Sequence, residues 1–176
     1  GLLTISSLLF VSCENVDFGD ENLNPNAISK ANTGALITSA MRNLPGLVSS
    51  VNPLLLSQQV SEITYNDDSC YETIQWNFDS FYTGPLMNLQ TVIDLNTSDP
   101  GSYSSSGSAG MQMGVAHLLQ VYMYQVMTDR WGAIPYSEAL KGVDNLKPKF
   151  DSQKDVYTGM LAQIDAAVGM LDGGGV

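Results

Sequence analysis

The sequence has 176 residues, of which 44% are hydrophobic and 14% are charged, a composition that fits one globular domain of ordinary size. Seven Lys and Arg against 18 Asp and Glu leave a formal net charge of −11, and no basic cluster could neutralise a row of phosphates. Nucleic-acid binding is therefore excluded. Two cysteines and one histidine are too few for a disulfide framework or a four-ligand zinc site, so we predict neither a metal ion nor another cofactor.

The N-terminal residues 1–12 form an uncharged apolar run that ends just before Cys13. This run is too short to span a bilayer, which takes about 20 apolar residues, but it fits the apolar part of an export signal. A buried strand or helix is the alternative. Phe10-Val11-Ser12-Cys13 resembles a bacterial lipobox, with Phe10 where Leu is usual, and a lipobox cysteine carries a diacylglycerol on its sulfur. We predict a truncated lipoprotein signal peptide over residues 1–12 and a membrane anchor that consists of lipid on Cys13 alone.

Residues 13–28 are abruptly polar and acidic, which is typical of an extended tether that leads away from a membrane surface. At the other end, residues 173–176 read Gly-Gly-Gly-Val directly after an amphipathic helix. We interpret them as a truncated end, and the chain as the N-terminal part of a larger domain.

Residues 29–172 are predicted to be all-α, because successive helical patterns follow one another and no segment shows sustained two-residue alternation. The pairing of helices suggests helical hairpins of the tetratricopeptide kind, although no repeat of about 34 residues is visible.

Caps and prolines mark the first three helices. Thr33 or Ser29 can cap the first, which should stop at Pro45-Gly46. Pro53 fits the first turn of the second, and a third starts near Tyr82 with another proline close to its start. Their expected inward positions are Leu36, Ile37, Ala40 and Met41, then Leu54, Leu55, Val60 and Ile63, then Leu86, Leu89, Val92 and Ile93.

A fourth helix is predicted over residues 109–131 after a Ser-Gly-rich loop, and it is apolar nearly all round, as a central helix is. Gln112, His117, Gln120 and Gln125 interrupt it, so it is not a membrane span. A last helix opens at Asp151 or Ser152, and Ser152 can form a capping-box-like pair with Asp155. Its expected core positions are Val156, Tyr157, Met160, Leu161, Ile164, Ala167, Val168 and Leu171.

Three segments resemble the SusD/RagB family in sequence, order and spacing. They are residues 21–26 (ENLNPN), residues 129–140 (DRWGAIPYSEAL) and residues 148–157 (PKFDSQKDVY). The resemblance implies that residues 29–172 are the N-terminal helical region of a SusD-like lipoprotein on the outer face of the outer membrane. It further implies a protein that caps a SusC-like, TonB-dependent β-barrel transporter and captures an oligosaccharide or peptide for import.

The segment 129–140 is the most specific part of this resemblance, and we expect its role to be architectural. A glycine there allows a backbone φ above zero, a proline prevents the helix from resuming, and a tyrosine can fold back with its hydroxyl hydrogen-bonded. The motif residues are Asp129, Trp131, Gly132, Pro135, Tyr136 and Glu138.

Residues 66–82 have the composition of a glycan site, because sugars stack their C–H faces on aromatic rings and need fixed polar partners for their hydroxyls. This helix-joining segment carries five aromatic residues, four acids and two asparagines. The resemblance implies that it contributes to ligand contact, and the candidates are Trp76, Asp67, Asp68 and Tyr71. The alternative is that Phe78, Phe81 and Tyr82 pack against the third helix while the two aspartates are solvated loop residues.

Other reactive side chains receive ordinary interpretations. The lone His117 is predicted to be a satisfied core histidine, the Met-rich stripe to be packing, and Cys70 to be a buried or inert thiol. No Lys or Arg occurs between Arg42 and Arg130, which favours a neutral ligand over an anion.

The leading hypothesis is a non-catalytic nutrient-binding lipoprotein. A glycoside hydrolase with paired carboxylates and a helical scaffold that contacts only proteins are the alternatives.

Overall fold

The computed structural model describes residues 30–71 and 77–173, and the chain divides into two compact units, Gly1–Ala31 and Asn32–Val176. The predicted signal peptide, the lipidation site Cys13 and nearly all of the predicted tether lie outside the described residues, as do Trp76 and residues 174–176. The second unit is all-α apart from one short strand pair, which confirms the predicted fold class.

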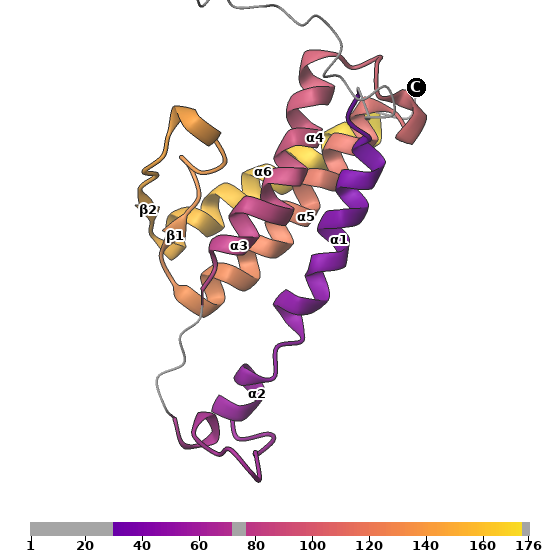
Figure 1. Cartoon of the computed structure of the whole chain (residues 1–176). Helices are drawn as coiled ribbons and strands as arrows, with labels where there is room; N and C mark the ends of the chain where they lie inside the picture. Colours follow the sequence, from indigo (N-terminus) through magenta and orange to yellow (C-terminus); the bar gives the residue numbers. More distant parts are fainter. Residues whose placement is uncertain (1–29, 72–76, 174–176) are drawn as a thin grey trace, which may run out of the picture. The chain divides into compact units, whose positions relative to one another are not determined.

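The longest helix, α5 (Ala109–Trp131), is the central element of this unit (Figure 1). It packs against α1 (Thr33–Val48), α4 (Met87–Ser98) and α6 (Gln153–Gly173). Helix α5 thus contacts both the helix before it, α4, and the helix after it, α6, as successive helical hairpins do. Its bounds agree with those predicted. At its start Ser108 Oγ accepts a hydrogen bond from Met111 N over 3.3 Å, and at its end Gly132 adopts φ +73°.

Helix α1 differs from its predicted bounds at both ends. Its cap is Asn32, whose Oδ1 accepts from Ala35 N over 3.0 Å, and Thr33 is instead its first helical residue. The helix also continues through Pro45 to Val48. This continuation carries Leu47 into the core, where its side chain is fully buried, and Ser49 N closes the helix on Pro45 O over 2.8 Å.

Helix α2 (Asn52–Leu56) is shorter than predicted. Pro53 does lie in its first turn and Leu55 is buried, but the backbone of Gln58 is left-handed at φ +56°, which ends the helical path. The predicted inward positions Val60 and Ile63 are therefore wrong, and Ile63 is 98% exposed.

The third predicted helix begins earlier than Tyr82. It is a continuous helical stretch of α3 (Asp79–Phe81), a π-turn (Tyr82–Leu86) and α4. Asn77 Oδ1 accepts from Asp79 N over 2.7 Å at its start. Pro85 thus lies inside the helix, and the wider π-turn accommodates a residue that has no N–H to donate.

Helix α6 begins after Ser152, whose Oγ accepts from Asp155 N over 3.2 Å, so the predicted cap is confirmed. Its buried residues are Val156, Met160 and Ala167, on the face toward α5. The predicted core positions Tyr157, Leu161 and Val168 are wrong, because four- and seven-residue steps place them together on a neighbouring face that stays exposed.

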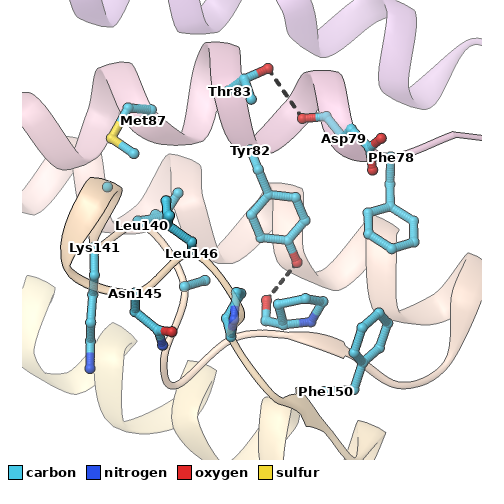
Figure 2. A pocket seen from close by; sticks show the side chains of 14 residues that line it. Phe78, Asp79, Tyr82, Thr83, Met87, Leu140, Lys141, Asn145, Leu146 and Phe150 are labelled. Atoms are coloured by element: carbon cyan, nitrogen blue, oxygen red, sulfur yellow. Dashed lines mark hydrogen bonds between the residues drawn. The ribbon is translucent and has the colours of Figure 1, made fainter.

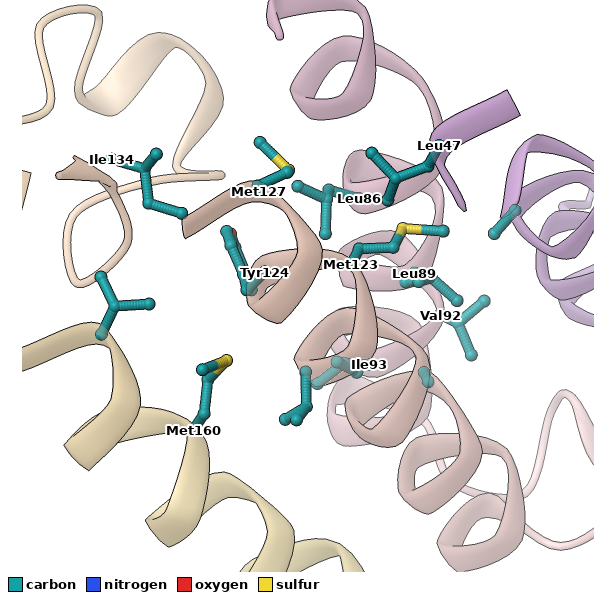
Figure 3. Packing of buried hydrophobic residues seen from close by; sticks show 14 residues of the cluster. Leu47, Leu86, Leu89, Val92, Ile93, Met123, Tyr124, Met127, Ile134 and Met160 are labelled. Carbon is teal, nitrogen blue, oxygen red and sulfur yellow. The ribbon is translucent and has the colours of Figure 1, made fainter. Parts of the chain in front are cut away.

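The hydrophobic core surrounds α5, where α1, α4 and α6 contribute buried residues (Figure 3). Met123 and Met127 of α5 are fully buried there among Leu47, Leu86 and Leu89. The Met-rich stripe is thus packing at these positions, whereas Met111 is about half exposed.

Strands β1 (Ile134–Pro135) and β2 (Phe150–Asp151) pair antiparallel, with Ile134 opposite Asp151 and Pro135 opposite Phe150. They close the loop between α5 and α6. Strands of two residues carry no alternation, so the sequence pattern did not reveal them. Among the described residues, no helix is long and apolar enough to cross a membrane.

Candidate functional site

The turn after α5 is held by the carboxylate of Asp151 in β2. Asp151 Oδ2 accepts hydrogen bonds from Ser137 N over 2.7 Å and from Tyr136 N over 3.2 Å, while Oδ1 accepts from Ser137 Oγ over 3.0 Å. Lys149 Nζ lies 3.5 Å from Oδ1. Burial alone would raise the pKa of Asp151, but these donors outweigh it and hold the pKa below its ordinary value. The carboxylate is therefore ionised at neutral pH and organises this corner.

Other motif residues also make architectural contacts. Thr128 Oγ1 donates to Gly132 O over 2.6 Å, and Asp129 Oδ1 accepts from the Tyr157 hydroxyl over 2.7 Å. Glu138 Oε2 accepts from Lys149 N over 3.3 Å. These contacts join the end of α5 to the start of α6 and position the loop between them.

A connected row of aromatic rings runs from β2 to this corner. Phe78 contacts Phe150, Trp131 and Tyr82 edge-to-face, with ring centroids 6.4, 5.5 and 5.9 Å away. Tyr82 then contacts Tyr124 at 6.1 Å. Phe78, Phe81 and Tyr82 all pack against the core, as the packing alternative predicted.

The row continues from Tyr124 to Tyr136, whose centroids are 4.9 Å apart. Burial, together with nearby negative charge on Asp151, raises the pKa of Tyr82 and of Tyr136. Burial raises the pKa of Tyr124 as well. All three hydroxyls therefore stay protonated at neutral pH and can donate hydrogen bonds.

An open cavity of about 460 Å³, here called the aromatic cavity, lies between the start of the α3–α4 stretch and the loop that precedes β2. Figure 2 shows Tyr82 directed into it, with its hydroxyl donating to Pro135 O over 2.5 Å, and shows Phe78 facing Phe150. Its described lining residues are Phe78, Asp79, Tyr82, Thr83, Met87, Pro135, Ala139, Leu140, Lys141, Gly142, Asn145, Leu146, Pro148 and Phe150. Aromatic surface with a few polar groups at its edge can bind the apolar face of a ligand and orient its polar atoms.

A second, smaller hollow of about 280 Å³, here called the polar niche, borders the same loop. Three carboxamides, from Gln90, Gln120 and Gln163, and the imidazole of His117 line it together with Tyr124 and residues of the loop. Ala139 and Leu140 line both hollows.

Of the four predicted ligand contacts, none lies among the described residues of either hollow. Asp67 is exposed, Asp68 accepts from Asn52 Nδ2 over 3.4 Å beside α2, and Tyr71 is 60% exposed. Trp76 lies outside the described residues. The predicted segment 66–82 nevertheless reaches the aromatic cavity through its last part, Phe78, Asp79 and Tyr82.

Two further side chains differ from their predicted surroundings. Cys70 is exposed rather than buried, because the short 3₁₀ turn Asp68–Cys70 presents it to solvent. His117 is half-buried, and its Nδ1 lies 2.9 Å from Gln163 Nε2. Within the described residues, no three His, Cys, Asp or Glu side chains are grouped closely enough to hold a metal ion.

The polar niche was missed from the sequence. In the sequence, Gln112 and Gln120 served only to exclude a membrane span, yet both are 3% exposed and therefore need partners inside the protein. Gln112 Nε2 donates to Gly107 O and Tyr103 O over 2.7 and 2.8 Å. The available signal was a glutamine on a helix predicted to be central. A buried amide requires hydrogen-bond partners, and neighbouring elements must supply them.

The fold and its two hollows define a helical-hairpin protein with the features of a binding module. A family model described as starch-binding and associating with the outer membrane matches residues 25–176. The chain therefore belongs to the SusD-like family. A comparison with curated proteins gives no match.

Proposed function

We propose that this protein is a non-catalytic nutrient-binding lipoprotein that captures a glycan on the outer face of the outer membrane and delivers it to a SusC-like, TonB-dependent transporter. The observation that carries the proposal is the family match over residues 25–176, whose description joins starch binding to the outer membrane. An oligosaccharide is the favoured ligand, and a peptide is the second ligand class.

The aromatic cavity supports capture of an uncharged ligand. Phe78, Tyr82 and Phe150 offer ring surface for the C–H faces of a sugar, and Asn145 and Thr83 offer polar atoms at the edge. Asp79 is the one carboxylate among its described lining residues and Lys141 the one cation, so the cavity has no excess of either charge.

Trp76 is proposed as a further ligand contact, because it is close in sequence to Phe78, which lines the aromatic cavity. Isothermal titration of the full chain with starch oligosaccharides tests this. A Trp76→Ala variant should bind about two- to twelvefold more weakly, since stacking of one ring contributes about 0.5–1.5 kcal/mol beyond the area it buries. Tyr65→Ala is the matched control, because Tyr65 is an 80% exposed ring of the same helix-joining region outside the segment 66–82. Unchanged affinity of the Trp76 variant would remove this residue from the site.

The membrane anchor is proposed to be lipid on Cys13. Radiolabelled fatty acid should enter the full-length parent protein and should not enter its Cys13→Ala variant. Equal labelling of both proteins would contradict the proposed anchor.

Catalysis is the competing function for a glycan-binding surface. A glycosidase needs two carboxyl groups about 5–9.5 Å apart across the scissile bond. Asp79 is the one carboxylate among the described residues that line the aromatic cavity. Incubation of the protein with oligosaccharides should therefore produce no new reducing ends. Turnover that persists in repurified protein would replace the binding proposal with a hydrolase.

Delivery to a barrel is tested by co-purification from outer membranes. The protein should be recovered together with a TonB-dependent barrel and should bind an oligosaccharide in solution. Recovery of the barrel without affinity for any oligosaccharide or peptide would favour the protein-contacting scaffold.

A further inference from the structure

The polar niche combines three carboxamides from three different helices, an arrangement that hydrophobic packing alone does not require. Gln90 comes from α4, Gln120 from α5 and Gln163 from α6, and Gln120 is only 3% exposed. Burying an amide costs about 1–3 kcal/mol unless it is hydrogen-bonded, whereas an apolar side chain of similar size would stabilise the same position. The three glutamines are therefore a feature to explain.

Hydrogen bonds within the niche leave acceptors in excess. Gln163 Nε2 lies 2.9 Å from Gln120 Oε1, 2.9 Å from His117 Nδ1 and 3.5 Å from His117 O. His117 O lies in the middle of α5, where the helix supplies its donor. The side-chain oxygens of Gln90, Gln120 and Gln163 each accept one hydrogen bond, from Gln120 Nε2, Gln163 Nε2 and the Tyr136 hydroxyl. Each of these oxygens can accept a second hydrogen bond, so the niche has room for further donors.

The niche also offers a donor of its own. When Gln163 Nε2 donates to Nδ1, the neutral imidazole of His117 carries its hydrogen on Nε2. No other described residue hydrogen-bonds to that Nε2. A hydroxyl group both donates and accepts, so a ligand with several hydroxyls matches a wall that presents both functions.

The charge of the walls selects against ions. No Asp, Glu, Lys or Arg is among the described lining residues, and burial lowers the pKa of His117, which keeps the imidazole neutral at pH 7. Two carboxylates are linked to the niche: Asp94 accepts from Gln90 Nε2 over 2.8 Å, and Asp151 accepts from the backbone N–H groups of Tyr136 and Ser137. Both carboxylates already have hydrogen-bond donors, and no lining side chain offers an ionic ligand an opposite charge.

Size and shape point to a single small ring. A volume of about 280 Å³ lies just below the roughly 300–1,000 Å³ range of pockets for drug-sized ligands. The rings of Tyr124 and Tyr136 supply the aromatic side of the niche. Leu140, which lines both hollows, is held at φ +62°, a conformation that costs a side chain such as Leu about 1–2 kcal/mol. Strained residues of this kind cluster at ligand sites.

We propose that the polar niche binds one uncharged, hydroxyl-rich sugar ring, separately from the aromatic cavity. The inference rests on the proposed function in one respect, because the ring is taken to be part of the captured glycan. The carboxamides of Gln90 and Gln163 contact its hydroxyls, and the Tyr136 ring covers its C–H face.

The single histidine of the chain provides a probe inside the niche. We would label histidine with ¹³C and ¹⁵N in the full chain, titrate with D-glucose and maltotriose, and follow the His117 imidazole signals by NMR. Saturable shifts are expected with both sugars, and D-glucuronate should give no shift. In the same NMR titrations, the Gln163→Leu variant should bind both D-glucose and maltotriose at least tenfold more weakly than the parent.

Gln163 also bridges α5 and α6, so Gln90→Leu is the second variant and should also lose at least tenfold in affinity. Gln125→Leu on the exposed surface of α5 is the matched control and should bind like the parent. Thermal unfolding of each variant shows whether it is folded.

Two failures are distinguishable. If maltotriose binds by calorimetry while the His117 signals stay fixed and folded Gln90→Leu binds normally, the niche inference is overturned and the proposed capture function stands. If the His117 signals saturate with sugar but the protein neither anchors in the outer membrane nor associates with a barrel, the niche stands and the proposed delivery function fails. Absence of any His117 shift with both sugars also overturns the inference.

Discussion

Gly159 of α6 lies directly against the ring of Tyr136: a Cβ built on this glycine would overlap Cε1 of Tyr136 and come within 3.0 Å of its hydroxyl oxygen. The same hydroxyl donates to Gln163 Oε1 over 2.9 Å, one helical turn further along α6. Tyr136, which follows the motif residue Pro135, therefore packs against α6 at Gly159, where a side chain would collide with its ring.

Gly159→Ala should destabilise the protein by about 1–3 kcal/mol, because overpacking forces the ring away from its position. This outcome opposes intrinsic helix propensity, which favours Ala over Gly by about 1 kcal/mol. Denaturant unfolding measures the change. Gly169→Ala on the same helix is the control, since a Cβ there meets no atom within 4 Å, and it should raise stability by up to about 1 kcal/mol. Equal gains from both substitutions would show that Tyr136 does not occupy this position.

Asp151→Asn should lower the free energy of unfolding at pH 7 by about 2–3 kcal/mol. The carboxylate accepts from Tyr136 N and from Ser137 N and Oγ, and an amide placed there turns its NH₂ toward donors that then lack an acceptor. Urea titrations of the parent and the variant at pH 7 measure this difference.

The pH dependence of the same site has a definite sign. Because the folded pKa of Asp151 lies below its ordinary 3.8, the folded state favours the ionised form. The stability from this group is present above about pH 3.8 and is lost as the pH falls through the folded pKa. The difference between parent and Asp151→Asn should therefore narrow in that acidic range. A constant difference down to pH 2 would contradict this assignment.

Tyr82→Phe should destabilise the protein by about 1–2 kcal/mol, since Pro135 O is left without its donor beside the aromatic cavity. The ring itself remains, so affinity for an oligosaccharide should change less than stability does. Phe150→Ala is the contrasting variant, because its ring is 61% exposed and contacts Phe78. It should leave stability within about 1 kcal/mol and weaken binding, as measured by thermal unfolding and calorimetry. If Phe150→Ala lowered stability but left binding unchanged, and Tyr82→Phe weakened binding more than stability, the ligand would bind away from this cavity.

Local signals in the sequence were sufficient for the bounds of α5 and the cap of α6. Ser108, Gly132 and the Ser152–Asp155 pair act on backbone groups within a few residues, so their effect can be predicted without the fold. Pro45 shows the limit of such signals. The helix continues past it because Leu47 is buried against other helices, and that gain depends on tertiary packing.

The sites depended still more on distant contacts. Asp151 reads as a helix cap in the sequence, whereas its oxygens bind backbone groups of residues 136 and 137. Gln90, Gln120 and Gln163 come from three helices, and no spacing along the chain reveals that they meet. Among its described residues, the segment 66–82 borders the aromatic cavity only at its C-terminal end, because the turn at Cys70 keeps Asp67 and Tyr71 on the exposed side.

His117 makes the α5–α6 contact sensitive to acid. Its Nδ1 accepts from Gln163 Nε2 over 2.9 Å, and burial lowers its pKa below the ordinary 6.5. Above about pH 6.5 the ring is neutral in both the folded and the unfolded chain. Below that pH the unfolded chain takes up its proton first, so the free energy of unfolding falls until the folded pKa has been passed.

His117→Gln removes the titrating group, so its free energy of unfolding should stay flatter than that of the parent as the pH is lowered from 7 through this window. NMR titration of the imidazole should independently give a folded pKa below 6.5. Asp151→Asn is the control, because its carboxylate titrates at lower pH and should leave the slope near pH 6 unchanged. An imidazole pKa at or above 6.5, or equal slopes for parent and His117→Gln, would mean that Gln163 does not hold the ring in its neutral form.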